Sequence, residues 1–268
     1  MKNAIKAFLK VLVPVKLRPK LRAIYRRVYY FGFKYKCPFC HSHLRTFTPV
    51  GLEFPVLREK KVVGGGYRGN ALCPFCGSYD RERLVYLYLL HKTNIFENPQ
   101  KVLHVAPEAS LADMLRKQAS VDYLTADLYS NGVMVKIDIT NIPFPDNSFD
   151  SIICNHVFEH IIDDRKAMSE LYRTLKAGGW AIPQVPLSLA LEKTYEDFSI
   201  TSTTGREKAF GQGDHVRIYA KDYKDRLEHT GFKVDVFKWV TESENFGGRR
   251  NRFGLNEEEC LFLASRYL

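Results

Sequence analysis

The stretch VKIDITNIPFPDNSFDSIICNHVFEHIIDDRKAMSELYRTLKAGG, residues 135–179, decides the fold of this chain. One apolar run ends at Asp138, a polar turn with two prolines follows, and a second apolar run leads to His156. Apolar residues then recur at helical spacing until the glycine pair 178–179, where we expect the helix to end. This order of strand, turn, strand and helix is typical of a parallel α/β sheet, in which ligands bind where the strands end.

The same pattern continues on both sides of this stretch. The run LVYLYLLHK at 84–92 has the apolar spacing of a helix. A chain of 268 residues can hold one α/β domain and a smaller appendage. Strands are predicted at 101–105, 121–126, 231–238 and 260–264, and a further helix at 111–117.

The formal charge of +10 is concentrated at the amino-terminal end. Residues 1–36 contain eleven Lys and Arg and no Asp or Glu, so the other 232 residues carry a formal charge of −1. A nearly neutral body argues against a nucleic-acid-binding face spread over the whole protein. The basic arm can still meet phosphate, either of lipid headgroups or of RNA.

The start of this arm has helical spacing of apolar residues, namely Ile5, Phe8, Leu9 and Leu12, with lysines beside them. Two interpretations stay open: a basic helix on an anionic membrane surface, or a helix packed on the protein's own body. The uncharged runs of the arm are too short for a signal-peptide core or a membrane span. We therefore expect a cytoplasmic protein that can associate with a membrane.

Four of the six cysteines form two identical tetrapeptides, CPFC at 37–40 and again at 73–76. Without an export signal, such pairs indicate a zinc site rather than disulfides, and four thiolates make a closed, structural site. The predicted ligands are Cys37, Cys40, Cys73 and Cys76. The glycine run 64–66 predicts a flexible excursion between the pairs, and Cys154 and Cys260 are expected to be buried apolar residues.

A family resemblance follows from these motifs. IDITNIPFPDNSFDSIICNHVFEHI at 137–161, followed by LYRTLKAGGWAIPQVP, resembles the type-11 group of class I S-adenosylmethionine-dependent methyltransferases. The CPFC pairs, the APE turn at 106–108 and GQGDHVRIYAKDYKDRLEHTGF resemble a bacterial subgroup that bears a zinc ribbon. The resemblance implies an α/β fold with a Rossmann-like seven-stranded sheet, parallel except for one strand. We divide the chain into a basic arm (1–36), a zinc-ribbon-like module (37–82) and a methyltransferase domain (83–268).

The resemblance also implies a cofactor site for S-adenosylmethionine. Asp127 lies 19 residues after Glu108, close to the roughly 20-residue offset at which a carboxylate meets ribose hydroxyls. Glu108 can bind the ammonium of the cofactor's methionine part, and Asp138 the adenine amino group. The sequence departs from the family where glycines are common, at 106, 108 and 110. The cofactor residues implied are His104, Ala106, Glu108, Asp127, Leu128, Asp138, Ile139, Asn155 and His156.

Methyl transfer to a hydroxyl needs in-line placement and a base. His215 is our preferred base, and His156 the second candidate. The set His156, Glu159 and His160 could hold a divalent cation, but we favour Glu159 as a helix cap. The match of HVFEH to an inverted zinc-protease motif is rejected, because no later glutamate has matching helical context.

Other polar residues are candidates for anion or acceptor contacts. Glu196, Asp197 and Arg217 are candidates for contacts with the acceptor; the alternative for residues 191–210 is a surface loop. Arg81 and Arg83 either contact an anionic ligand or form a solvated helix start, and we favour the latter. The expected function is O-methylation of a glycan, a lipid-linked glycan or another small hydroxyl-bearing acceptor. The alternatives are an RNA methyltransferase, although we do not expect a nucleic-acid partner, and a non-enzymatic binding protein.

Overall fold

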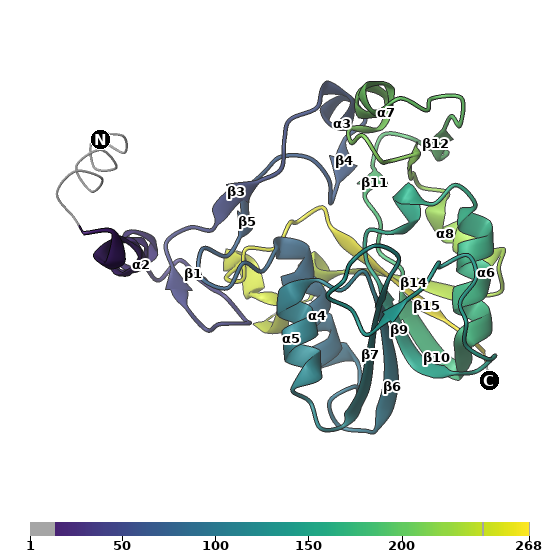
Figure 1. The fold of residues 1–268 in the computed structure, drawn as a ribbon, viewed down its shortest axis with the longest axis horizontal. Helices are drawn as coiled ribbons and strands as arrows, with labels where there is room; N and C mark the ends of the chain where they lie inside the picture. The colour runs from purple at the N-terminus through teal and green to yellow at the C-terminus, as the bar shows by residue number, and fades with distance from the viewer. Residues whose placement is uncertain (1–13, 243, 268) are drawn as a thin grey trace.

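The computed structural model describes residues 14–242 and 244–267 (Figure 1). The amphipathic helix predicted around Ile5 to Leu12 lies outside the described residues. The described part of the arm forms a short 3₁₀ turn, η1 (Val15–Leu17), and helix α2 (Arg18–Tyr30). Within the described ranges, no helix combines the length and the apolar character needed to cross a membrane.

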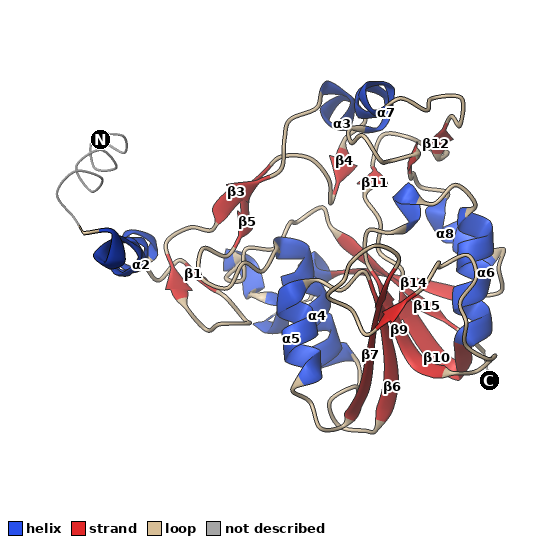
Figure 2. Ribbon diagram, in the orientation of Figure 1, coloured by secondary structure: helices blue, strands red, loops and turns tan. Residues whose placement is uncertain are grey.

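The centre of the molecule is a seven-stranded sheet in the order β14-β15-β10-β9-β6-β7-β8 (Figure 2). β15 runs antiparallel to both of its neighbours, and every other pairing is parallel. The predicted sheet, parallel with one antiparallel strand, is therefore confirmed. The strands are β6 (Gln100–Val105), β7 (Val121–Asp127), β8 (Val135–Lys136), β9 (Phe149–Cys154), β10 (Leu175–Ile182), β14 (Lys233–Lys238) and β15 (Cys260–Ser265).

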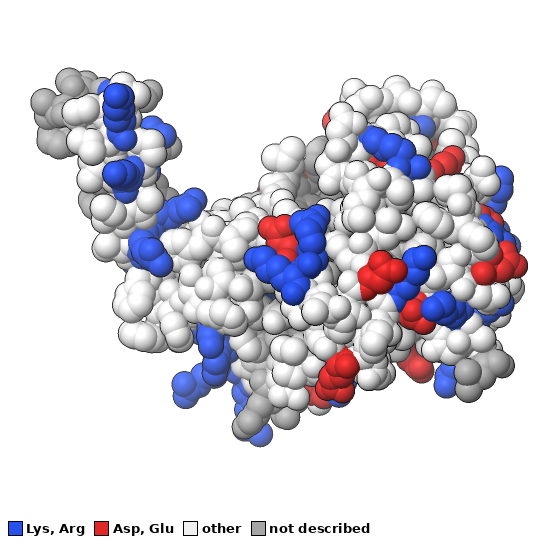
Figure 3. Space-filling model, turned by 60° about the horizontal axis from the view of Figure 1, so that its bottom comes forward, with Lys and Arg blue, Asp and Glu red and all other residues white. Residues whose placement is uncertain are grey.

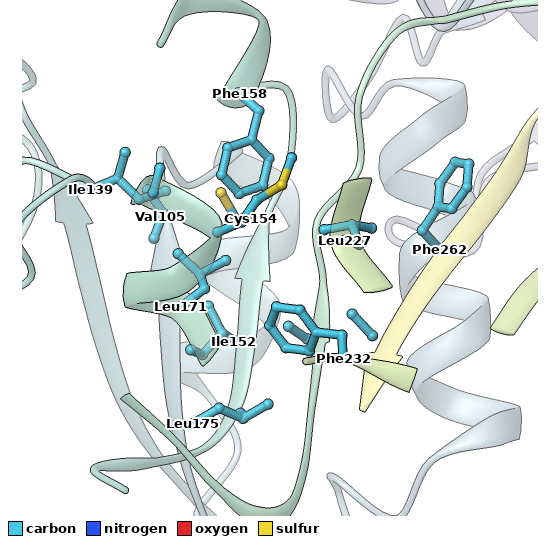
Figure 4. Close-up of a cluster of buried hydrophobic side chains, with 14 of the residues drawn as sticks. Val105, Ile139, Ile152, Cys154, Phe158, Leu171, Leu175, Leu227, Phe232 and Phe262 are labelled. Atoms are coloured by element: carbon cyan, nitrogen blue, oxygen red, sulfur yellow. The ribbon is translucent and has the colours of Figure 1, made fainter. Parts of the chain in front are cut away.

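Alternating side chains of the strands enter two apolar layers, one on each face of the sheet. On one face, Ile152 packs with α6 (Asp164–Thr174) and α8 (Tyr223–Glu228), as Figure 4 shows for Leu171 and Leu227. On the other face, Ile153 packs with α4 (Asp80–Lys92) and α5 (Ala109–Arg116). Both faces of the sheet are thus covered, which leaves the ends of the strands to form a site.

Helix α6 differs from its prediction at both ends. It ends at Thr174, not at the glycine pair, because Leu175 pairs with Phe149 and begins β10. The apolar spacing of a helix continues in the sequence beyond Thr174, but Leu175 joins the parallel pairing of β10 with β9 instead. At its start, the side chain of Asp163 accepts a hydrogen bond from the Lys166 N–H. Asp163, and not Glu159, is the cap.

The two CPFC tetrapeptides form matching turns. His41 N–H donates to Cys37 O, and Gly77 N–H donates to Cys73 O in the same way. The four Sγ atoms all lie within 4.8 Å of one another, and the Sγ atoms of Cys37 and Cys76 are 3.6 Å apart. Zn–S bonds of about 2.3 Å in a tetrahedron require S···S separations of about 3.8 Å, so the residues fit the zinc ion expected from the sequence.

Short strands surround these turns: β1 (Tyr35–Lys36) pairs with β2 (His43–Leu44), and β3 (Thr48–Val50) pairs with β5 (Arg68–Leu72). The predicted boundary at 82/83 falls inside α4. Cys154 is fully buried, as expected, and Cys260 is partly buried against the same core.

The segment between the two turns is ordered into secondary structure rather than a flexible excursion. It forms α3 (Pro55–Glu59) and β4 (Val62–Val63), and β4 pairs with β11 (Leu187–Ser188) beyond the central sheet. Helix α3 lies beside α7 (Thr203–Phe210), and Val56, Phe210 and Ile218 share an apolar cluster (Figure 1). With β12 (Tyr195–Glu196) and β13 (Arg217–Ile218), these elements form a cap, residues 51–67 and 187–218.

Candidate active site

A cleft of about 490 Å³ lies where the cap meets the carboxyl ends of the central strands. β6 and β9 are neighbours in the sheet, and the chain turns to opposite sides of the sheet after them. This is the position at which open α/β sheets bind ligands. The sheet supplies one wall, the segment between the CPFC turns a second, and residues 207–215 a third; its polar lining includes Arg68, Tyr79, Arg81, His156, Glu159, His160, Glu207 and His215.

The turn after β6 is strained at Ala106. Its φ is +48°, in the left-handed region that favours glycine, and its N–H donates to Ala126 O. The sequence departed from the family at this position, and the structure shows that the backbone has kept the conformation in which glycine is common.

A buried chain of polar groups follows this turn. Tyr123 OH lies 2.8 Å from His104 Nδ1, and His104 Nε2 lies 3.1 Å from Glu108 Oε2. Asn155 Nδ2 donates to the same carboxylate oxygen over 3.4 Å. The remaining oxygens, Glu108 Oε1 and Asn155 Oδ1, are buried without a hydrogen-bond partner among the described residues. Buried acceptors without partners are costly, so this pair fits a donor that arrives with a ligand, such as an ammonium group.

Glu108 carries its charge in this setting. Burial would raise the pKa of Glu108, but the hydrogen bond from His104 and the charges of His104 and Arg81 outweigh it and hold the pKa below its usual value. An ionised carboxylate with one free oxygen is the group that an ammonium requires.

Asp127 is the last residue of β7, and Asp138 follows the neighbouring strand β8. Each uses one oxygen to close a turn: Asp127 Oδ1 accepts from Tyr129 N, and Asp138 Oδ1 accepts from Thr140 N. Their second oxygens make no hydrogen bond to the described residues. Leu128 is half-exposed and Ile139 buried beside these turns. The structure therefore brings Glu108, Asp127 and Asp138 to one edge of the sheet, each with an oxygen to spare.

His156 stands directly after β9 in another strained turn. Its φ is +55°, and its N–H donates to Gln184 O over 2.7 Å. Its Nδ1 lies 3.4 Å from Glu159 Oε1, whereas Nε2 is buried without a partner among the described residues. Burial lowers the pKa of His156, and the charge of Arg81 lowers it further. A neutral imidazole with a free nitrogen therefore borders the cleft.

Three further side chains meet beside it: a carboxylate O of Glu159 and ring nitrogens of His160 and His215 all lie within 4.8 Å of one another. Val216 N–H donates to Glu159 O over 2.9 Å, which fixes the two segments together. Burial lowers the pKa of His215 to about 4, although the Glu159 charge acts in the opposite direction.

Glu159 is ionised and has an unpaired oxygen. Burial would raise the pKa of Glu159, yet the hydrogen bond from His156 and the three nearby imidazoles outweigh it and lower the pKa to about 2. Its Oε2 is buried without a partner among the described residues. The donor set of Glu159, His160 and His215 can hold a divalent cation, or the carboxylate can stabilise a charged imidazole.

The predicted acceptor contacts Glu196 and Arg217 bind each other instead. Arg217 is buried; its Nε donates to Glu196 Oε2 over 2.9 Å, and its other nitrogens donate to the carbonyls of Phe158, Ile161 and Ile162. Their geometry is that of a support that ties the cap to the loop after β9. Asp197 Oδ1 closes a turn by accepting from Ser199 N.

The two arginines in the first turn of α4 have different environments, and neither is a solvated side chain. Arg83 is buried and donates to the carbonyls of Ala71, Ser78, Phe253 and Gly254. Arg81 lines the cleft, and its Nε is buried without a partner among the described residues. The sequence favoured a solvated position for Arg81, whereas it lines the cleft. The pattern that could have indicated this was its place in a charged tetrapeptide next to an apolar run.

Comparison with known proteins places a family domain over these strands. Residues 91–182 match the family described as "Methyltransferase domain". A demethylmenaquinone methyltransferase of Paenarthrobacter aurescens is 33% identical over 107 residues, which cover 33% of this chain and 42% of that protein. A ubiquinone/menaquinone biosynthesis C-methyltransferase of Psychromonas ingrahamii is 30% identical over 143 residues, which cover 52% and 55%.

The chain thus spans about half the length of the curated relatives it matches. Among solved structures, an S-adenosylmethionine-dependent methyltransferase from Archaeoglobus fulgidus aligns with 69% of this chain and 94% of its own, at 16% identity and a TM-score of 0.45. The matched family region contains β6, β7, β8 and β9, the strands that carry the predicted cofactor residues.

Proposed function

We propose that residues 91–182, which match the methyltransferase family, form a class I S-adenosylmethionine-dependent methyltransferase domain, and that the whole protein methylates a hydroxyl group of a polar acceptor bound under its cap. The relatives are named for quinone substrates, and those names describe the relatives and not this chain. The family match ends at residue 182, before β11 and the later part of the cap, so it carries no information about the acceptor wall.

The cofactor would be held by the groups that the structure leaves with spare hydrogen-bonding capacity. Glu108 Oε1 and Asn155 Oδ1 suit the ammonium, and Arg81 Nε suits the carboxylate, of the methionine part. Asp127 suits the ribose hydroxyls, and Asp138 the adenine amino group. When bound, S-adenosylmethionine supplies an electrophilic methyl group.

The observation that carries the proposal is the pairing of His215 with Glu159 in the cleft. His215 takes the proton from the acceptor hydroxyl as its oxygen attacks the methyl carbon, and Glu159 stabilises the imidazolium that forms. The bound cofactor would supply the methyl group, and its sulfur would keep the electron pair of the methyl–sulfur bond. Arg217 and Glu196 keep the cap in place rather than contacting the acceptor.

The lining of the cleft supports a polar acceptor such as a glycan or a lipid-linked glycan. Nine of its 19 lining residues have charged or hydrogen-bonding side chains, and six are glycines. An apolar quinone ring would leave these groups unpaired, which costs binding free energy.

The test is to find the methylated product. An extract is prepared from a strain in which the gene for this protein is deleted. The extract is incubated with the protein and with S-adenosylmethionine that carries a ¹³C-methyl group. Mass spectrometry should show a glycan or glycolipid that gains one labelled methyl, and the ¹³C shift should be that of an O-methyl group. A C-methyl shift on a ring would contradict O-methylation, labelled RNA would favour the RNA methyltransferase alternative, and an absence of cofactor binding would contradict the enzyme itself.

A further inference from the structure

Helix α2 stands apart from the body of the protein. Figure 1 shows it beyond the ribbon module, on the side away from the central sheet. None of its 13 residues is buried. At about 1.5 Å per residue it is roughly 20 Å long, so it presents an extended surface to its surroundings.

This helix has an apolar stripe on one side. Leu17, at the end of η1, and Leu21, Ile24 and Val28 of α2 follow the spacing i, i+4, i+7, i+11, which places them on one face. Their exposed fractions are 48%, 39%, 59% and 73%. Scattered exposed apolar residues are ordinary, but a continuous exposed stripe marks a contact surface.

Basic residues border this stripe on both sides. On a helical wheel, Lys16, Lys20 and Arg27 lie to one side and Arg18 and Arg22 to the other. No acidic residue occurs in this helix or in the chain before it. Figure 3 shows blue side chains on the projecting arm with no red beside them. An apolar stripe between two basic rows is the arrangement that lies in the interface of an anionic bilayer.

The carboxyl end of α2 is anchored, so its orientation is set by the ribbon. Arg45 N–H donates to Tyr30 O over 2.9 Å, and the Arg45 guanidinium lies 4.1 Å from the centre of the Tyr29 ring. Tyr30 packs against the cysteine cluster. The anchor holds the helix without covering its stripe.

We propose that α2 is a docking helix for anionic phospholipid membranes, with Leu17, Leu21, Ile24 and Val28 inserted among the acyl chains and the flanking Lys and Arg at the phosphates. The proposal is independent of the methyl-transfer chemistry. It would place the enzyme at the surface where a lipid-linked acceptor resides.

Sedimentation with vesicles tests it on the full chain. We expect the protein to bind mixed phosphatidylglycerol–phosphatidylcholine vesicles and to bind phosphatidylcholine vesicles much less. Ile24→Ser/Val28→Ser leaves the charge unchanged and should weaken binding at least ten-fold. Lys20→Gln/Arg22→Gln should weaken it about five-fold per charge removed, since each basic residue contributes about that factor near an anionic surface.

The matched control is Tyr267→Ser, an exposed apolar residue far from the helix, which should bind like the wild type. Because the substituted side chains of α2 are exposed, the variants should keep the wild-type melting temperature and cofactor affinity. The proposal would be overturned by an absence of vesicle binding, by full binding of Ile24→Ser/Val28→Ser, or by a dimer in sedimentation velocity that covers the stripe. Tight binding of RNA together with weak vesicle binding would also overturn it.

Discussion

The carboxylate of Glu159 and the imidazole of His215 lie within 4.8 Å of each other, although one follows β9 and the other precedes β13. The hydrogen bond from Val216 N–H to Glu159 O holds them there. A buried carboxylate beside a buried histidine favours the protonated state of the ring when a proton arrives from a substrate. The acceptor side of the proposed reaction depends on this pair.

Glu159→Gln should lower turnover about 100-fold or more, because the imidazolium formed on His215 loses its counter-charge. Cofactor affinity should stay near that of the wild type, since Glu108 and its partners are unchanged. Single-turnover transfer of labelled methyl and calorimetry with S-adenosylmethionine measure the two effects. Glu207→Gln removes the same charge from another wall of the cleft and should have a small effect; equal losses in both variants would show a general charge effect.

Glu108→Gln should weaken cofactor binding by roughly 10- to 100-fold, the range of a charged hydrogen bond of about 1.5–3 kcal/mol. The free Oε1 is replaced in part by an amide donor, which opposes an ammonium group. Calorimetry with S-adenosylmethionine and with S-adenosylhomocysteine measures the change. Asp113→Asn, at an exposed pair with Arg116, is the control; unaltered affinity in Glu108→Gln would remove Glu108 from the cofactor site.

The sequence predicted the central sheet well and the cap poorly, for physical reasons. Strand periodicity and the acidic residues after strands are local features, so β6 to β9 and the placing of Asp127 and Asp138 could be predicted. The pairing of Val63 with Leu187 and the packing of Val56 on Phe210 join distant segments, and no local pattern encodes them. The family resemblance identified His215 as a candidate. The burial of Glu159 beside it and the hydrogen bond from Arg217 to Glu196 could be seen only in the structure.

Removal of the metal predicted at the four cysteines should impair acceptor turnover more than cofactor binding. The chain between the two CPFC turns forms a wall of the cleft, whereas Asp127 ends β7 and Asp138 lies just after β8 of the central sheet. Cys40→Ser should lose zinc, measured by atomic emission, and lose turnover with a smaller change in cofactor affinity. His43→Ala, an exposed neighbour outside the cysteine cluster, should keep both. Full turnover by a zinc-free protein would contradict this coupling.

The cap should be sensitive to volume at Gly211. A Cβ there would lie 2.4 Å from Leu57 Cγ, and φ is +82°. Gly77 has a φ of +79° and nothing within 4 Å of the same position, so it is a matched control. Gly77→Ala should cost about 1 kcal/mol of unfolding free energy from backbone strain, and Gly211→Ala about 1–3 kcal/mol more from overpacking. Denaturant unfolding compares them; equal costs would contradict the contact between α3 and the end of α7.

Glu259 gives a pH prediction with a definite sign. Burial raises the pKa of Glu259 to about 7 from 4.5, so its ionisation destabilises the folded state increasingly as the pH rises from 4.5 through 7. Glu259→Gln keeps an acceptor for Gln184 Nε2 and should stabilise the protein by roughly 2–3 kcal/mol at pH 8. The gain should vanish below pH 4.5. Glu258→Gln, an exposed neighbour, should show no such dependence in urea unfolding at the two pH values; a gain independent of pH would contradict the account.

The most direct measurement is methyl transfer by His215→Asn, with the acceptor-containing extract and labelled S-adenosylmethionine. The account predicts wild-type cofactor affinity by calorimetry together with a turnover lower by about 100-fold or more, while His229→Asn, at an exposed helix end, transfers methyl at the wild-type rate. Wild-type turnover by His215→Asn would contradict the assignment of His215 as the base and, with it, the proposed chemistry of the cleft.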